Sequence, residues 1–204
     1  FPKKEHNSRF GGLDNWFKAY NNEQIQTSFT EIVDTSNKIK NNEILPINHF
    51  INEDKQAAIQ YIDNNLLNII DIHKDTEFIL VFPPYYRMKF AIWAQYNPTH
   101  YEVHKAVIEY LVLQSSKYGN LKVFGYENQD FLDDISNYKD LSHYHQSINS
   151  NMLHDFKKDV SLLTPNNVYT YIEQAEIKAR KFNIIEMGDK INSYLKNKPN
   201  LNTK

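Results

Sequence analysis

The stretch after residue 51 carries the first regular pattern of apolar positions. The recurring positions are Ala58, Tyr61, Ile62, Leu66 and Ile69. This helical spacing, behind Asn52 and Asp54 as possible N-caps, predicts an amphipathic helix that ends near His73. Residues 13–40 mix aromatic side chains with Asn, Gln and Thr and show no clean period. Only short helices are expected there.

A run of strand length at 77–82 is almost wholly apolar and is closed by Pro83-Pro84. Such a run is typical of a central parallel strand that is buried on both faces. The apolar spacing then predicts a helix over 103–111, stopped near Gly119, and a short strand over 121–126. Strand, helix and strand form a βαβ unit, in which the two strands are parallel.

The last third of the chain shows two more helical patterns. Ile148, Met152, Leu153 and Phe156 indicate one helix, and Thr164-Pro165 is a typical start for another that runs to about Lys181. Residues 183–204 are rich in Asn and Lys and are expected to form a polar tail. We therefore expect residues 1–182 to form one α/β domain.

The two strands that the sequence predicts are too few for a doubly wound sheet covered on both faces. The chain opens with Phe1-Pro2-Lys3-Lys4, which is neither a signal peptide nor a natural start. We therefore expect the chain to be truncated or processed, with the remaining strands of the sheet before Phe1. No apolar run approaches the roughly 18 residues of a membrane span.

Charge and composition narrow the possible functions. The 23 Lys and Arg residues are balanced by 25 Asp and Glu residues, which gives a net charge of −2 without a basic stripe. Nucleic acid is therefore not an expected partner. The absence of cysteine excludes thiolate catalysis and cysteine-bound zinc, and it leaves the cellular compartment open.

Asp140 and His143 are the candidates for catalytic chemistry. They follow the βαβ unit, on the side of the sheet where the carboxyl ends of strands build ligand sites. An Asp-x-x-His spacing lets the carboxylate accept a hydrogen bond from Nδ1 and leaves Nε2 as a general base. One alternative is that Asp140 only caps the following helix. Another is a metal site that adds His145 and His154.

Several motifs together resemble a known family. Phe82-Pro83-Pro84-Tyr85 at a strand end, then a helix, a strand, Asn137-Tyr138-Lys139-Asp140-Leu141-Ser142-His143-Tyr144 and Asn149 are similar to the C-terminal half of SGNH-type (GDSL-like) bacterial envelope proteins. The likeness covers residues 76–156. It implies a flavodoxin-like, three-layer α/β/α fold with a parallel sheet.

The resemblance also implies a function. In that superfamily Asp140 and His143 would complete a triad whose Ser follows the first strand, and a Gly and an Asn from other blocks would add to the oxyanion hole. None of those other blocks is present here. The implied activity is serine esterase or O-acyltransferase chemistry on an ester-linked acyl group of an envelope carbohydrate, without a cofactor or metal. The alternative is a non-catalytic relative that binds an envelope glycan or a partner protein.

Aromatic side chains are the candidates for substrate contacts. Tyr85 and Tyr86 follow the two prolines at the strand end and could stack against a sugar or acyl group, unless they pack at the rim of the core. Trp16 and Trp93 would suit carbohydrate binding only if their rings are exposed. The chain alone is expected to be inactive toward simple acetyl esters, because it lacks a nucleophile.

Overall fold

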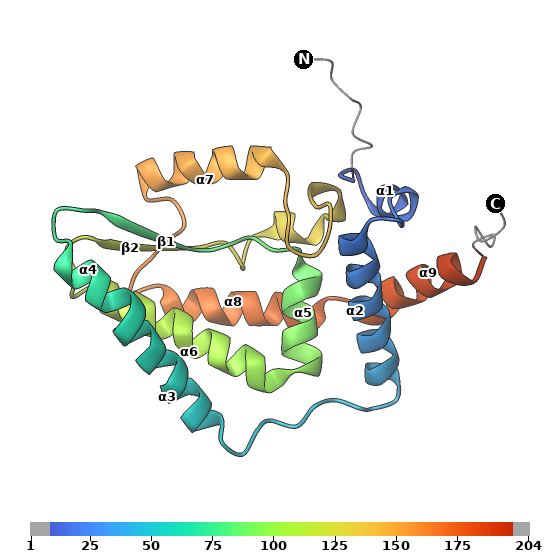
Figure 1. Cartoon of the computed structure of the whole chain (residues 1–204), viewed down its shortest axis with the longest axis horizontal. Coiled ribbons are helices and arrows are strands. Elements are labelled where there is room, and N and C mark those ends of the chain that lie inside the picture. The colour runs from blue at the N-terminus through green and yellow to red at the C-terminus, as the bar shows by residue number, and fades with distance from the viewer. Residues whose placement is uncertain (1–8, 198–204) are drawn as a thin grey trace, which may run out of the picture.

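The structure, a computed structural model, describes residues 9–197 and is an α/β protein dominated by helices (Figure 1). The elements are α1 (Leu13–Lys18), α2 (Glu23–Lys40), α3 (Ile51–Ile62), a π-helical turn (Asp63–Leu67), α4 (Asn68–Ile72), β1 (Phe78–Phe82), α5 (Arg87–Tyr96), α6 (Pro98–Ser115), β2 (Leu121–Gly125), two 3₁₀ turns (Asp130–Asp133 and Ile135–Asn137), α7 (Gln146–Lys158), β3 (Leu162–Leu163), α8 (Val168–Lys181) and α9 (Ile184–Asn197). Within this part of the chain, no helix is long and apolar enough to cross a membrane.

The sheet has the strand order β1-β2-β3. β1 and β2 are parallel, with Phe78 opposite Leu121 and Phe82 opposite Gly125, so the predicted βαβ unit is confirmed. The connection between them contains two helices, α5 and α6. The expectation of a purely parallel sheet is wrong, because the two-residue strand β3 pairs antiparallel with β2. So short a strand leaves no alternating pattern in the sequence.

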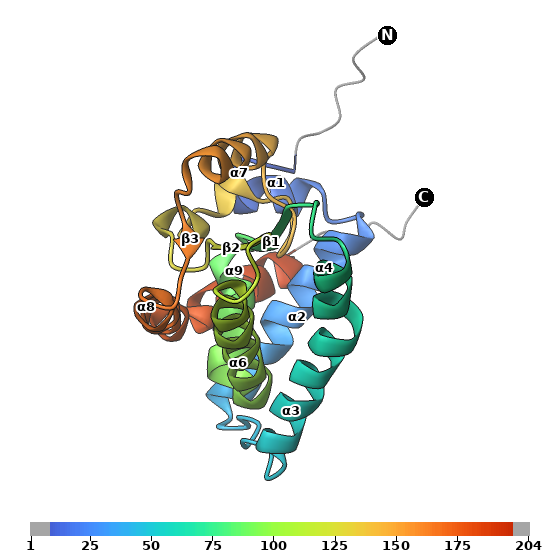
Figure 2. The same cartoon turned by 90° about the vertical axis from the view of Figure 1, so that its left-hand side faces the viewer.

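The sheet position expected for β1 is also wrong. Among residues 9–197, β1 pairs with β2 alone, so that β2 is central and β1 is an edge strand (Figure 2). The side chain of Ile79 is exposed, so β1 is not buried on both faces. A short apolar run indicates a strand but does not distinguish a central strand from an edge strand.

Helices lie on both faces of the sheet. In Figure 1, α7 lies above the strands, and α3, α6 and α8 lie below them. The α7 side is filled by Phe124, Tyr126, Ile148 and Met152. The opposite core is larger and packs Phe82 and Val123 against side chains of α4, α6 and α8.

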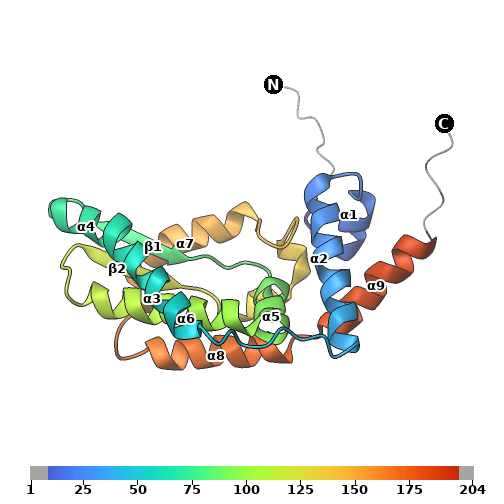
Figure 3. The ribbon, with the colours of Figure 1, turned by 60° about the horizontal axis from the view of Figure 1, so that its bottom comes forward.

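The expected polar tail is wrong for residues 184–197, which form α9. This helix crosses α2, and α1, α2 and α9 gather at one end of the molecule, away from the strands (Figure 3). Ile184 and Ile191 are buried in the same core as Ile25 and Ile32 of α2. The remaining residues of the predicted tail, 198–204, lie outside the described residues.

Several helix starts differ from the sequence patterns. α2 has 18 residues rather than being short, and the Asn22 side chain caps it by accepting from the backbone N–H groups of Gln24 and Ile25. α3 begins at Ile51, before the caps that were expected. α8 begins at Val168, with Thr164 in the preceding turn. The helices predicted over 103–111 and 148–156 are confirmed as α6 and α7, and each is longer than its apolar pattern.

Candidate functional site

Asp140 and His143 lie in a tight loop between the second 3₁₀ turn and α7. The loop closes on itself, because the backbone N–H of Lys139 donates to the carbonyl oxygen of His143 at 3.0 Å. The Asp140 carboxylate is buried, and its Oδ1 accepts from the backbone N–H groups of Ser142 and His143 at 2.9 and 2.8 Å. Both carboxylate oxygens also lie within hydrogen-bond distance of Nδ1 of His143, at 2.8 and 2.9 Å.

This geometry assigns the two nitrogens of the His143 ring. An ionised carboxylate only accepts hydrogen bonds, so Nδ1 carries the proton and Nε2 is left as the acceptor. The His143 side chain is 54% exposed, and within residues 9–197 its Nε2 makes no hydrogen bond. The expected contact between Asp140 and His143 is therefore confirmed. Asp140 does not cap α7, whose N-cap is His145.

Buried hydrogen bonds attach this loop to the carboxyl end of β1. The backbone N–H of Tyr86 donates to the carbonyl of Leu141 at 3.1 Å, and the Tyr138 hydroxyl donates to the carbonyl of Pro84 at 2.9 Å. Burial raises the pKa of Tyr138 above its ordinary value, so its hydroxyl stays protonated as this donor. From α1, the indole N–H of Trp16 donates to the carbonyl of Tyr138 at 2.9 Å.

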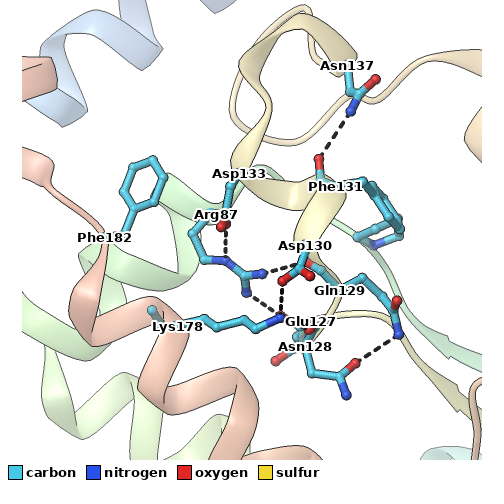
Figure 4. A network of polar contacts seen from close by, with 12 residues as sticks. Arg87, Glu127, Asn128, Gln129, Asp130, Phe131, Asp133, Asn137, Lys178 and Phe182 are labelled. Atoms are coloured by element: carbon cyan, nitrogen blue, oxygen red, sulfur yellow. Dashed lines mark hydrogen bonds and ion pairs between the residues drawn. The ribbon is translucent and has the colours of Figure 1, made fainter.

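Arg87 fixes the segment that leads from β2 to this loop (Figure 4). Its side chain is fully buried, its Nε donates to Oδ1 of Asp133 at 2.7 Å, and its Nη2 donates to the carbonyl of Gln129 at 2.6 Å. Its Nη1 donates to the carbonyl of Glu127. A planar guanidinium presents several donors in fixed directions, so one side chain holds three points of the segment. Sequence reasoning missed Arg87, because a lone arginine carries no local pattern.

A cavity of about 470 Å³ lies between α2 and the loop that holds Asp140 and His143. Its walls are one side of α2 from Glu23 to Glu31, Lys89 of α5, and residues 140–143. The ammonium of Lys89 lies 2.8 Å from Oε1 of Glu31. The cavity thus lies between the Asp-His pair and α2, a helix that no sequence pattern had placed near the pair.

The two tyrosines at the end of β1 have different surroundings. Tyr86 is 1% exposed and packs among Trp16, Tyr138 and Phe182 in the core. The expected stacking of Tyr86 on a ligand does not fit this position, because neither face of the ring is accessible. Tyr85 is half-buried and stacks on Phe90, and its contact with a substrate stays a prediction.

The two tryptophans belong to the packing of the protein. Trp16 is fully buried at the centre of the core formed by α1, α2 and α5. Trp93 is partly buried between Phe90, His100 and His104. Trp16 therefore offers no exposed ring face to a sugar, and Trp93 packs against three neighbouring rings.

The other histidines near the pair have local contacts. Nδ1 of His145 lies 2.8 Å from Oγ of Ser147, and the ring meets Phe10 edge to face. His154 is an exposed residue of α7. In the part of the chain that the structure describes, no three His, Asp or Glu side chains are grouped so that they could hold a metal ion. The alternative of a metal site at Asp140 thus has no matching ligand set there.

Comparisons with known proteins do not add to this geometry. Neither protein-family models, nor curated proteins, nor solved structures gave a match to the chain. The functional assignment therefore depends on the chemistry of the site itself.

Proposed function

We propose that Asp140 and His143 are the orienting acid and the general base of an SGNH-like serine esterase or O-acyltransferase. The observation that carries this proposal is the buried Asp140 carboxylate on Nδ1 of His143, whose half-exposed ring lies beside a cavity and whose Nε2 has no hydrogen bond among residues 9–197. This arrangement prepares an imidazole to take a proton from a hydroxyl nucleophile. The pair lies at the carboxyl end of β1, which is where ligand sites form in the proposed flavodoxin-like, three-layer α/β/α fold.

The proposed reaction has two steps. A serine outside residues 1–204 attacks the ester carbonyl while His143 takes its proton, and the protonated His143 then returns it to the leaving alcohol. Water or an acceptor hydroxyl resolves the acyl-enzyme by the same route in reverse. Asp140 keeps the ring in the productive tautomer throughout. The proposed substrate class is an acyl ester of a cell-envelope carbohydrate, and the same family resemblance favours a location in the cell envelope.

A serine-directed fluorophosphonate probe tests this proposal in a polypeptide that includes the serine-bearing region. We expect His143→Ala to slow labelling of that serine by on the order of 10²- to 10⁴-fold, the usual contribution of a general base. His154→Ala is the matched control, because His154 is an exposed histidine of α7 and lines no part of this cavity. Equal labelling of His143→Ala and wild type, with both folded, would contradict the proposed role.

A second candidate function is a non-catalytic module that binds an envelope glycan or a partner protein. It is favoured by the lack of any hydroxyl bonded to Nε2 of His143 among residues 9–197. Under this alternative the serine-bearing position would hold another residue, and the probe would label nothing. The 204-residue chain by itself is expected to leave simple acetyl esters intact under either function.

A further inference from the structure

The cavity beside His143 has an excess of negative charge. Glu23, Glu31 and Asp140 contribute three carboxylates to its walls, and Lys89 contributes the one ammonium among the described lining residues. Arg9 is not a lining residue, and its guanidinium already donates to the side chains of Asn22 and Gln24 at 2.7 and 2.8 Å. A phosphate or carboxylate that entered this space would meet more repulsion than attraction.

The ammonium of Lys89 is already engaged. It lies 2.8 Å from Glu31, and both side chains are mostly buried, with exposed fractions of 23% and 31%. An anionic ligand would have to replace Glu31 as the partner of Lys89, and it would leave the Glu31 carboxylate without its counter-charge in a partly desolvated wall. Glu31 therefore acts against anions twice, through its own charge and by occupying Lys89.

The remaining lining suits hydroxyl groups. Gln24, Thr27, Ser28 and Ser142 bring amide and hydroxyl groups to the walls, and Leu141 alone among the described lining residues is apolar. Carboxylate and amide oxygens accept hydrogen bonds from ligand hydroxyls, and the aliphatic parts of these side chains can pack against the carbon–hydrogen faces of a sugar. The volume of about 470 Å³ is large enough for a sugar unit.

We infer that this cavity binds a hydroxyl-rich, sugar-like group without negative charge, and that the Glu31–Lys89 pair determines this charge selectivity. The inference rests on the proposed function only in taking this cavity as the substrate site. It narrows the substrate class to neutral or cationic carbohydrate esters. Lys89 and Glu31 are specificity-determining residues here, and neither takes part in the chemical step.

Binding to the 204-residue chain can be measured without turnover. The probes are three trisaccharides of similar size: N-acetylglucosamine units for the neutral one, glucosamine for the cationic one and galacturonic acid for the anionic one. The NMR signals of the His143 ring report occupancy and are assigned by their loss in His143→Ala. We expect the neutral and cationic sugars to bind roughly 10-fold or more tightly than the anionic sugar at low salt.

Glu31→Gln supplies the critical comparison. It removes one negative charge and frees Lys89, so we expect affinity for the anionic sugar to rise roughly 3- to 10-fold relative to the neutral one. Glu53→Gln makes the same change on the exposed face of α3 and should leave the ratio unchanged. Anion binding equal to neutral binding in wild type, or no response of His143 to any of the three sugars, overturns the inference. Neither result depends on fluorophosphonate labelling, which reports the catalytic role separately.

Discussion

Oδ1 of Asp140 lies 2.8 Å from both the backbone nitrogen and the ring Nδ1 of His143. One carboxylate oxygen therefore shapes the turn and orients the ring that the turn carries. This double role explains why the capping and the catalytic interpretations of Asp140 could not be separated by spacing alone. The carboxylate does cap backbone N–H groups, but those of its own loop rather than those of α7.

The first prediction concerns the tautomer of His143. In Asp140→Asn the amide oxygen can keep the two backbone hydrogen bonds, while the amide N–H₂ faces Nδ1 and needs it as an acceptor. We expect the ring proton to move to Nε2 with the fold retained, which removes the acceptor that a nucleophile needs. Long-range nitrogen–proton NMR spectra of the neutral ring report this directly. A ring that keeps its proton on Nδ1 in this variant would contradict the hydrogen-bond assignment.

The candidate pair was readable from sequence because it is local, and the rest of the site was not. Asp140 and His143 are three residues apart, so that one loop brings them together. The indole of Trp16 and the carbonyl of Tyr138 that accepts its hydrogen bond are separated by 122 positions, and Lys89 and Glu31 are separated by 58. No pattern in a single sequence connects residues at such distances.

The elements of the fold were likewise predicted where the sequence has a clear local pattern and missed where it does not. The βαβ unit was predicted because its strands are apolar runs bounded by turn residues. α5 was missed because Met88, Phe90, Ala91 and Ile92 are buried on several sides, which removes the polar face that makes a helix recognisable. α9 does have apolar residues at helical spacing, namely Ile184, Met187, Ile191 and Leu195. It was predicted as a polar tail because of the Asn and Lys residues between and after them.

A second prediction follows from the three hydrogen bonds of Arg87. Lysine keeps the charge in Arg87→Lys, but one ammonium cannot reach Asp133 and the carbonyls of Glu127 and Gln129 together. Buried carbonyls left without a donor should lower the free energy of unfolding by on the order of 2–4 kcal/mol, measured by urea denaturation. Arg180→Lys is the matched control, because its side chain is 46% exposed, and it should cost less than about 1 kcal/mol. Equal effects of the two changes would show that the Arg87 bonds are not stabilising.

A third prediction tests the packing of α9 on α2. A Cβ atom at Gly188 would overlap with Cβ and Oγ of Ser36. Gly188→Ala should therefore lower the free energy of unfolding by about 1–3 kcal/mol, despite the better helix propensity of Ala. Gly119→Ala meets no atom within 4 Å and serves as the control. If residues 184–197 were an unpacked tail, both changes would be nearly neutral.

Ser36 provides the second half of that test. Its Oγ is buried and has no hydrogen-bond partner within residues 9–197. Ser36→Gly removes both atoms that Gly188→Ala would strike, so the double variant should recover much of the loss caused by Gly188→Ala alone. Strictly additive effects in this double-mutant cycle would contradict the close approach of the two helices.

The last prediction concerns alkaline pH. Burial is the largest cause that raises the pKa values of Tyr86, Tyr101, Tyr138 and Tyr171 above the ordinary 10.0. In the unfolded chain these phenols lose their protons near pH 10, while in the folded chain they retain them to higher pH. Above about pH 10 the folded state therefore binds more protons than the unfolded state, so the free energy of unfolding falls as the pH rises. Below that pH the contribution of these tyrosines to stability is fully present.

Urea denaturation at a series of alkaline pH values measures this slope, and ultraviolet absorbance reports phenolate formation. Each delayed tyrosine contributes up to about 1.4 kcal/mol per pH unit, so Tyr101→Phe should make the fall less steep by up to that amount. The hydroxyl of Tyr101 makes no hydrogen bond among the described residues, which keeps the change close to a simple removal of the phenol. Phenolate formation at Tyr101 near pH 10 in the still-folded protein would show that burial does not hold its proton.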